Sequence, residues 1–268
     1  MKTTLQLPQI NPEKETQKIT QFIKDTLKKQ RFKKAVIALS GGVDSTTTLY
    51  LTLQALGKQN VDILLLPYGT MSDEATRDAT VACEIANVSK SNIQTIDIRS
   101  AVDTLVTSLN IRNNDISAGH RVGNIMARIR MIEIFDQAKK MNSLVIGTEN
   151  KSEHYLGYFT RFGDEASDIE PIRHLYKTQI FELARYLGVP DKVVTKAPTA
   201  ELWQGQTDEG EFGFTYTTAD QILYGLVEKK LSPKQLLKSG IRQSDINRVM
   251  KRVEANQFKH HVPILLKK

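Results

Sequence analysis

The chain has 268 residues, of which 40% are hydrophobic and 25% are charged, and its formal net charge is +7. This composition indicates a globular protein of one or two domains and excludes disordered and collagen-like chains, and no apolar run approaches the roughly 20 residues that a membrane-spanning helix needs. The N-terminus lacks the features of an export signal, so we expect a cytoplasmic protein.

The first part of the chain alternates patterns typical of helices and strands. Apolar residues recur at helical spacing or stand in short runs that end at glycine or proline. In chain order they predict a helix over 12–30, a strand over 34–39, a helix over 46–56, a strand over 61–66, a helix over 74–86, a strand over 93–98, a helix over 100–109, a polar loop over 110–119, a long helix over 121–140 and a strand over 143–147.

Beyond the fourth strand the pattern is looser. It predicts irregular stretches over 157–174 and 197–217 and helices over 179–187, 218–228, 233–238 and 244–255. Because strands that alternate with helices form parallel sheets covered on both faces, we predict a doubly wound α/β fold with a helical C-terminal portion. The expected parts of this single domain are a leading helix (1–33), an α/β core (34–200), a mobile loop (200–217) and a helical part (218–268).

The loop after the first strand carries the strongest motif, Ser40-Gly41-Gly42-Val43-Asp44-Ser45. Adjacent glycines allow a close approach of the main chain, and the following helix offers free N–H groups to phosphate. The loop lacks the spacing and the lysine of a Walker A motif. Asp44 would repel phosphate unless it held a cation, so the loop predicts a nucleotide site with Mg²⁺. The plainer alternative is a glycine turn with an N-capping residue.

This loop resembles the SGGxDS motif of the N-type ATP pyrophosphatases, which cleave ATP between the α- and β-phosphates. Other segments, taken in order, resemble the motifs of NAD synthetases, and the similarity covers about 35–230. The string GYFTRFGD at 157–164 and the string KAPTAEL at 196–202 distinguish this family from GMP synthetases. The remaining segments that resemble the family are 66–69 with 72–74, 123–131, and 147–168.

The resemblance implies a ligase that amidates nicotinic acid adenine dinucleotide (deamido-NAD) to NAD. An adenylated nicotinate would form with release of pyrophosphate, and ammonia would then displace AMP. Some relatives carry an amidase domain with a catalytic cysteine ahead of the synthetase, whereas residues 1–33 include no cysteine. We therefore expect an ammonia-dependent enzyme, with a separate glutaminase as a candidate source of ammonia. Relatives are homodimers with the dinucleotide site at the interface, so we expect a homodimer.

The resemblance also implies the residues of the site. Asp44 and Glu153 would be the ligands of Mg²⁺, and Asp44, Asp164 and Lys177 would be catalytic, with Asp164 holding or deprotonating ammonium and Lys177 supplying a mobile ammonium toward ATP. The ATP site would comprise Ala38, Leu39, Ser40, Gly41, Gly42, Val43, Asp44, Ser45, Thr148, Lys177 and Thr199. The deamido-NAD site would comprise Asn124, Arg128, Arg161, Asp168 and Lys259.

Some assignments stay open at this point. Asp164 could be an ordinary turn residue, and Arg130 could belong either to the site or to a salt bridge on the helix surface. Leu65, His120 and Phe258 depart from the family pattern, which leaves the adenine and nicotinate contacts at these positions undefined.

Residues 200–217 are expected to close over the site as a lid, with Trp203 as a fluorescent reporter, because glycines and carboxylates dominate the stretch. A tolerant surface loop is the alternative.

Two other functional classes compete with the ligase. The positive charge fits a tRNA-modifying ATP pyrophosphatase, although the thiolating members use paired cysteines and this chain has only Cys83. A nucleotide-binding sensor without catalytic activity would keep the phosphate loop but would not need Glu153 or the motifs on the nicotinate side. We expect no nucleic acid and no membrane partner.

Overall fold

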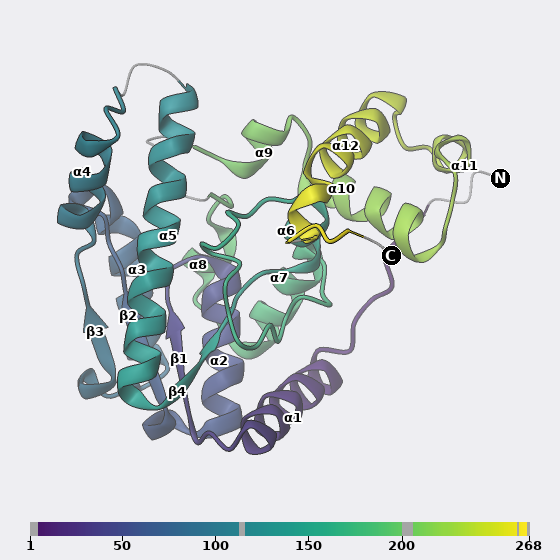
Figure 1. Cartoon of the computed structure of the whole chain (residues 1–268). Helices are drawn as coiled ribbons and strands as arrows, with labels where there is room; N and C mark the ends of the chain where they lie inside the picture. Colours follow the sequence, from purple (N-terminus) through teal and green to yellow (C-terminus); the bar gives the residue numbers. More distant parts are fainter. Residues whose placement is uncertain (1–4, 113–115, 200–205, 262, 267–268) are drawn as a thin grey trace.

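The computed structural model describes residues 5–112, 116–199, 206–261 and 263–266 (Figure 1). Its four strands form one parallel sheet in the order β3-β2-β1-β4. The chain runs outward from β1 to β3 and then crosses back to the other side of β1, so the topological switch point lies between β1 and β4. The strands are β1 (Lys34–Ala38), β2 (Val61–Leu65), β3 (Ile93–Thr95) and β4 (Ser143–Ile146).

Helices cover both faces of this sheet, as the alternating pattern predicted. Ala35 and Ile37 of β1 pack with α1 (Pro12–Gln30), α2 (Val43–Leu56), α3 (Asp73–Ile85), α7 (Lys177–Leu187) and α8 (Asp191–Thr195). Val36 points to the opposite face, as expected for neighbours on a strand, and packs with α4 (Arg99–Ser108) and α5 (Ile116–Met141). The doubly wound α/β fold is confirmed.

The C-terminal helices pack around a second apolar cluster beside the sheet (Figure 1). The cluster includes Leu156, Phe212, Ile222, Leu236 and Val249, each buried. The predicted helical C-terminal portion is therefore confirmed. The elements that contribute are α6 (Lys151–Leu156), α9 (Asp208–Phe212), α10 (Tyr216–Leu223) with the π-helical turn Tyr224–Glu228, α11 (Pro233–Lys238) and α12 (Gln243–Asn256).

Several boundaries differ from those predicted. The polar loop over 110–119 is shorter than expected because α5 begins at Ile116. The third strand ends at Thr95 rather than at 98, since its neighbour β2 runs into Pro67, which has no N–H for a longer ladder. The helices α6, α8 and α9 were not predicted, because five or six residues are too few to show a helical period. Short 3₁₀ turns occupy Lys58–Asn60, Gly69–Ser72, Lys90–Asn92 and Gln257–His260.

The stretch 200–217 is only partly covered by the structure, since 200–205, with Trp203, lies outside the described residues. Within 206–217 the predicted irregular stretch is wrong in part, because α9 covers Asp208–Phe212 and α10 begins at Tyr216, whereas the mobility of the loop stays a prediction. Phe212, Phe214 and Tyr216 are buried in the second cluster, and these aromatic side chains supply the apolar surface that the composition of 201–211 lacks. Closure of the stretch as a lid stays a prediction. Among the described residues, no helix is both long enough and apolar enough to span a membrane.

Candidate active site

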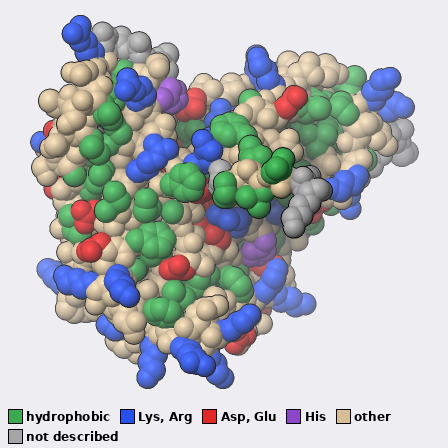
Figure 2. Space-filling view, viewed as in Figure 1, with side chains coloured by type: hydrophobic (Ala, Val, Ile, Leu, Met, Phe, Trp, Pro, Cys, Tyr) green, Lys and Arg blue, Asp and Glu red, His purple; other side chains and the backbone are tan. Residues whose placement is uncertain are grey.

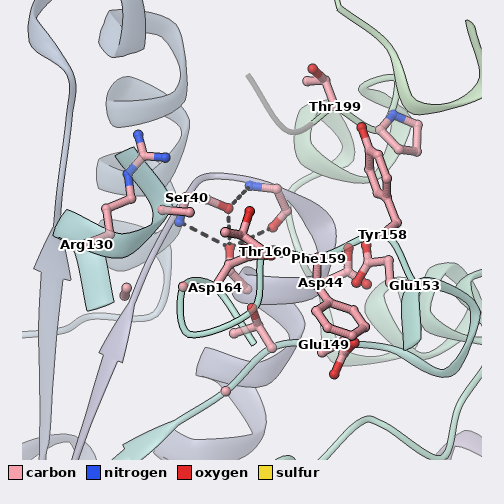
Figure 3. A pocket seen from close by; sticks show the side chains of 18 of the residues that line it. Ser40, Asp44, Arg130, Glu149, Glu153, Tyr158, Phe159, Thr160, Asp164 and Thr199 are labelled. Atoms are coloured by element: carbon pink, nitrogen blue, oxygen red, sulfur yellow. Dashed lines mark hydrogen bonds between the residues drawn. The ribbon is translucent and has the colours of Figure 1, made fainter. Parts of the chain in front are cut away.

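A cavity of about 460 Å³ lies at the carboxyl ends of β1, β2 and β4, where a doubly wound sheet places its ligands. The loop after β1 supplies Ser40, the loop after β2 supplies Pro67, and the loop after β4 supplies Thr148. The C-terminal helices complete the wall with residues such as Asp208 and Arg252. The cavity is therefore lined both by loops of the sheet and by the C-terminal portion (Figure 3).

The loop after β1 is held by its two serines. The Ser40 N–H donates to Ser45 Oγ at 3.3 Å, the two hydroxyls lie 3.0 Å apart, and the Gly42 N–H donates to Ser40 Oγ at 3.3 Å. Gly41 has φ +79°, and a Cβ there would collide with the carbonyl oxygen of Ala75 on α3. The N-cap of α2, Gly42, makes no side-chain cap, so the first-turn N–H groups remain available to an anion.

Lys177 lies between the two carboxylates predicted to bind metal. Its Nζ donates to Asp44 Oδ2 and, at 3.3 Å, to Glu153 Oε1, and its side chain is only 3% exposed. In this structure both carboxylates hold the Lys177 ammonium in a buried ion pair, and its movement toward ATP stays a prediction. The second Asp44 oxygen, Oδ1, accepts from Asn150 Nδ2 at 2.8 Å. Asp44 and Glu153 lie close together (Figure 3), and both contact the Lys177 ammonium.

The electrostatics of this group favour a cation between the carboxylates. Burial raises the pKa of Glu153 well above 4.5, and the neighbouring Asp44 charge raises it further. Burial alone would lower the pKa of the Lys177 ammonium, but Asp44 and Glu153 outweigh it and raise that pKa. Among the described residues, no three His, Cys, Asp or Glu side chains could hold a metal by themselves. Two carboxylates completed by phosphate oxygens are, however, a donor set that suits Mg²⁺.

A second wall of the cavity comes from the 157–164 segment. Asp164 Oδ1 accepts from the Thr160 N–H at 2.8 Å, and Thr160 Oγ1 donates to Asn124 Oδ1 at 2.8 Å. Desolvation raises the pKa of Asp164. Lys259 braces the segment from the C-terminal side, since its Nζ donates to the carbonyl oxygens of Gly157 at 2.6 Å and Phe159 at 2.9 Å. This wall presents the Asp164 carboxylate, the rings of Tyr158 and Phe159, and the Lys259 ammonium.

The structure brings together most of the predicted site residues. All residues predicted for ATP except Gly41 line the cavity, and so do Glu153, Asp164, Asn124 and Lys259. Three residues predicted for deamido-NAD do not line it, and for them this role stays a prediction. Arg128 Nε donates to the Arg161 carbonyl oxygen at 3.3 Å, and Asp168 Oδ2 accepts from the Val145 N–H at 2.8 Å.

The positions left open from sequence are now placed. Arg130 lines the cavity and donates Nε to the Leu66 carbonyl oxygen at 3.1 Å. Leu65 and His120 also line the cavity. Phe258 is 47% exposed and lies under the Arg161 guanidinium, whose carbon is 4.8 Å from the ring centre.

Two residues of the site were missed. Asn150, fully buried, caps α6 by accepting from the Glu153 N–H at 3.0 Å, while Glu153 Oε2 accepts from the Asn150 N–H at 3.2 Å. The Asn-x-x-Glu spacing of this capping box could have revealed it. Asp208 lines the cavity on α9 and accepts from the Tyr216 hydroxyl at 2.9 Å. No local sequence signal separates Asp208 from its acidic neighbours.

Glu170 holds the loop after β4 through a hydrogen bond to its main chain. Its Oε2 accepts from the Glu149 N–H at 3.1 Å, and its Oε1 accepts from Ser167 Oγ at 2.7 Å. Burial raises the pKa of Glu170 from 4.5 to about 7. The folded protein therefore holds this proton more tightly than the unfolded chain does, so ionising Glu170 costs stability.

We expect the Glu170 contribution to the free energy of unfolding to be largest below about pH 4.5 and to be lost as the pH rises to about 7. Each pKa unit corresponds to about 1.4 kcal/mol. Urea unfolding of wild type and Glu170→Gln at pH 5 and pH 8 measures this, with Glu84→Gln, an exposed carboxylate on α3, as the control. An unchanged pH dependence in Glu170→Gln would show that Glu170 is already ionised in the folded protein at pH 5.

Comparisons with known proteins agree with this geometry. A family model described as NAD synthase matches residues 15–263. The NH(3)-dependent NAD(+) synthetase of Fusobacterium nucleatum is 39% identical over 249 residues, which are 93% of each chain. The corresponding protein of Wolinella succinogenes is 41% identical over 253 residues, 94% of this chain and 95% of that one.

Solved structures show the same likeness. The NMN synthetase from Francisella tularensis superposes with a TM-score of 0.82 at 32% identity, covering 97% of this chain and 100% of that one. The NH3-dependent NAD synthetase from Campylobacter jejuni, solved with a nitrate ion, gives a TM-score of 0.79 at 32% identity, covering 96% and 100%.

Proposed function

We infer the course of the reaction in this cavity from the premise that the chain belongs to the NAD synthase family and converts deamido-NAD to NAD with ammonia. It is a ligase that forms a carbon–nitrogen bond, and members of its family use ATP. We place ATP here because the Ser40–Ser45 loop, which contains Asp44, lies beside Glu153 and Lys177 at the switch point of the sheet.

ATP would lie with its phosphates over the loop after β1. The first-turn N–H groups of α2 and the hydroxyls of Ser40 and Ser45 would bind phosphate oxygens. Asp44 and Glu153 would hold Mg²⁺, which neutralises charge on phosphate oxygens and so helps pyrophosphate to leave. Thr148 and Thr199, which line the cavity, would offer hydroxyls to ATP.

The nicotinate carboxylate would then approach from the 157–164 wall. Asn124 and Lys259 on that wall fit the charge and polarity of the dinucleotide. A carboxylate oxygen attacks the α-phosphorus and the α–β bridging bond breaks. Pyrophosphate departs, and the product that remains is an adenylated nicotinate. The chain needs no nucleophile of its own for this step, so it acts by orienting the reactants and stabilising charge.

Asp164 is the residue we assign to the nitrogen donor. Its carboxylate faces the cavity beside Thr160, and its raised pKa makes it a better proton acceptor than an ordinary aspartate. Asp164 would bind ammonium and accept one proton from it. The ammonia then attacks the carbonyl carbon of the adenylated nicotinate, and AMP leaves as the amide forms.

The likeness to an NMN synthetase supports a second acceptor, the nicotinate mononucleotide, which lacks the AMP half of deamido-NAD. Pyrophosphate release with ATP, Mg²⁺ and ammonia tests the acceptor directly. We expect release with deamido-NAD and formation of NAD. Faster release with the mononucleotide would make the chain a mononucleotide ligase, release with tRNA would make it a tRNA-modifying enzyme, and no release would leave a nucleotide-binding protein.

We also infer that the protein is a homodimer that pairs through α5. The sequence prediction rested on the homodimers of relatives, and of the apolar residues of α5, Met126, Ile129 and Ile134 are buried in the chain itself. Ile132 is 55% exposed, and hydrophobic side chains gather on the face over α4 and α5 (Figure 2). Leu109, the residue that caps the C-terminal end of α4, is 53% exposed.

Light scattering should give the mass of a dimer, and Ile132→Glu should shift it toward the monomer and lower activity together. Leu237→Glu, at a position 45% exposed on α11, is the matched control and should stay dimeric. A wild-type protein that is monomeric and fully active would contradict the prediction.

A further inference from the structure

Asp78 on α3 is a buried carboxylate that pairs with two lysines of the α8 segment. Asp78 is 3% exposed. Its Oδ1 lies 2.6 Å from Lys192 Nζ, and its Oδ2 lies 3.5 Å from Lys196 Nζ. The two lysines differ in where their side chains lie. Lys192 is 64% exposed and outside the cavity, whereas Lys196 is 21% exposed and lines it.

The wall that holds Lys196 borders the phosphate loop. Ala75, one turn before Asp78 on α3, contacts Gly41 so closely that no side chain fits between them. Ala75 and Thr76 line the same cavity. Lys196 is therefore fixed, through Asp78, to the helix against which the loop after β1 packs.

The charges on the two sides of the loop differ. On the α7 side the Lys177 ammonium is shared by two carboxylates, Asp44 and Glu153. On the α3 side one buried carboxylate, Asp78, faces two ammonium groups, and the shorter contact goes to Lys192. Lys192 also lies 3.8 Å from Glu74 Oε1, and of the two lysines the one that lines the cavity is Lys196. A buried carboxylate thus holds a lysine of the cavity wall beside the phosphate loop.

We propose that Lys196 binds the β- and γ-phosphates of ATP and the pyrophosphate that they become, and that Asp78 is its positioning residue. This inference rests on the ATP site proposed above. As the carboxylate–α-phosphorus bond forms and the α–β bridging bond breaks, negative charge grows on the departing bridging oxygen. An ammonium on this wall stabilises that charge without giving up a proton.

The pair of lysines provides a matched test. Lys196→Gln and Lys192→Gln each remove one ammonium from the same carboxylate, but only the first changes the cavity. Titration calorimetry with magnesium pyrophosphate and, separately, with AMP is the readout that does not depend on turnover. For Lys196→Gln we expect pyrophosphate affinity to fall about tenfold or more, the usual effect of losing one charged hydrogen bond, with AMP affinity unchanged. Lys192→Gln should change neither affinity beyond about twofold.

Turnover should follow the same pattern. In Lys196→Gln we expect kcat/KM for ATP to fall about 10- to 100-fold, and Lys196→Arg should recover most of it because the charge is kept. Asp78→Asn should lower pyrophosphate affinity less than Lys196→Gln does, since the ammonium remains but is no longer held. Equal effects of Lys192→Gln and Lys196→Gln, or parallel losses of AMP and pyrophosphate affinity, would overturn the proposal.

Ser40→Ala separates this inference from the ATP site on which it depends. Weaker pyrophosphate binding in Ser40→Ala, together with unchanged binding in Lys196→Gln, would refute the role of Lys196 and leave the ATP site in place. Unchanged binding in both variants would refute both assignments. Should Asp78→Asn fail to fold, the comparison of the two lysine variants still decides the question.

Discussion

Asp44→Asn should leave the protein folded and lower its turnover about 10²- to 10³-fold, the loss typical of removing a group that stabilises charge in the transition state. The amide keeps the shape of the side chain, but it removes the negative charge that faces Lys177 and, in our proposal, Mg²⁺. Pyrophosphate release at saturating Mg²⁺ measures the loss, and thermal unfolding without ligands measures the fold. Near-normal release at saturating Mg²⁺ would remove Asp44 from the site.

Asp62→Asn is the control for this variant. Asp62 is a buried carboxylate of β2, 9% exposed, with Lys34 Nζ 3.9 Å from its Oδ2. It stands near the amino end of the strand, away from the edge where the cavity opens. This substitution should change the free energy of unfolding without changing turnover beyond about twofold, as expected for a residue that touches no substrate.

Lys177→Met should abolish turnover and make the protein's stability depend on Mg²⁺. The variant leaves Asp44 and Glu153 facing each other without the ammonium, and breaking a buried ion pair typically costs about 3–5 kcal/mol. A divalent cation between the carboxylates would restore part of this stability. We expect Tm without metal to fall, and added Mg²⁺ to raise Tm more in Lys177→Met than in the wild type.

The pH dependence of this variant has a definite sign. The pKa of Glu153 is already raised by burial and by Asp44, while Lys177 opposes that rise. Without Lys177 the folded state holds the Glu153 proton still more tightly, so the loss of stability should be smaller at pH 6 than at pH 8.

Lys151→Met is the matched control for Lys177→Met. Each of the two ammonium groups lies over a tyrosine ring, Lys177 at 5.1 Å from the centre of Tyr216 and Lys151 at 4.8 Å from the centre of Tyr176. Lys151 pairs with Glu228 at 2.8 Å. Its side chain does not line the cavity, so Mg²⁺ should act on this variant as it does on wild type. A Mg²⁺ effect on Tm of the same size in Lys177→Met and wild type would refute the proposed metal ligands.

The fold was predictable from the sequence where the apolar pattern of a short segment is enough to identify a strand or a helix. The runs 34–39 and 61–66 are apolar, end at glycine or proline, and alternate with helices, which is enough to predict a parallel sheet. The short helices α6 and α9 were not predictable in the same way. Their position depends on packing in a cluster built from residues far along the chain, which includes Leu156 of α6, Phe212 of α9 and Val249 of α12.

The candidate site was predictable where sequence motifs carry it, in the loop after β1, at Glu153 and along the 157–164 wall. The Ser40–Ser45 loop and Glu153 carry their chemistry in their spacing. Asn150 and Lys196 depend on partners far away in sequence, Asp44 and Asp78, and no spacing reveals such pairs. The same holds for Arg128 and Arg130. Residues two positions apart in an α-helix are separated by about 200° around its axis, so these two side chains cannot share a face. Only packing decides which of them reaches the cavity.

The cavity draws its lining from Ala38, at the end of the first strand, and from Lys259, which braces the opposite wall. A ribosome delivers these residues in order, and domains generally fold as units while the chain emerges. The phosphate loop and the first two strands can form early, but β4 and the C-terminal helices arrive much later. A partly synthesised chain therefore has a nucleotide loop without its opposite wall, and it acquires the complete cavity only after Lys259 has left the exit tunnel.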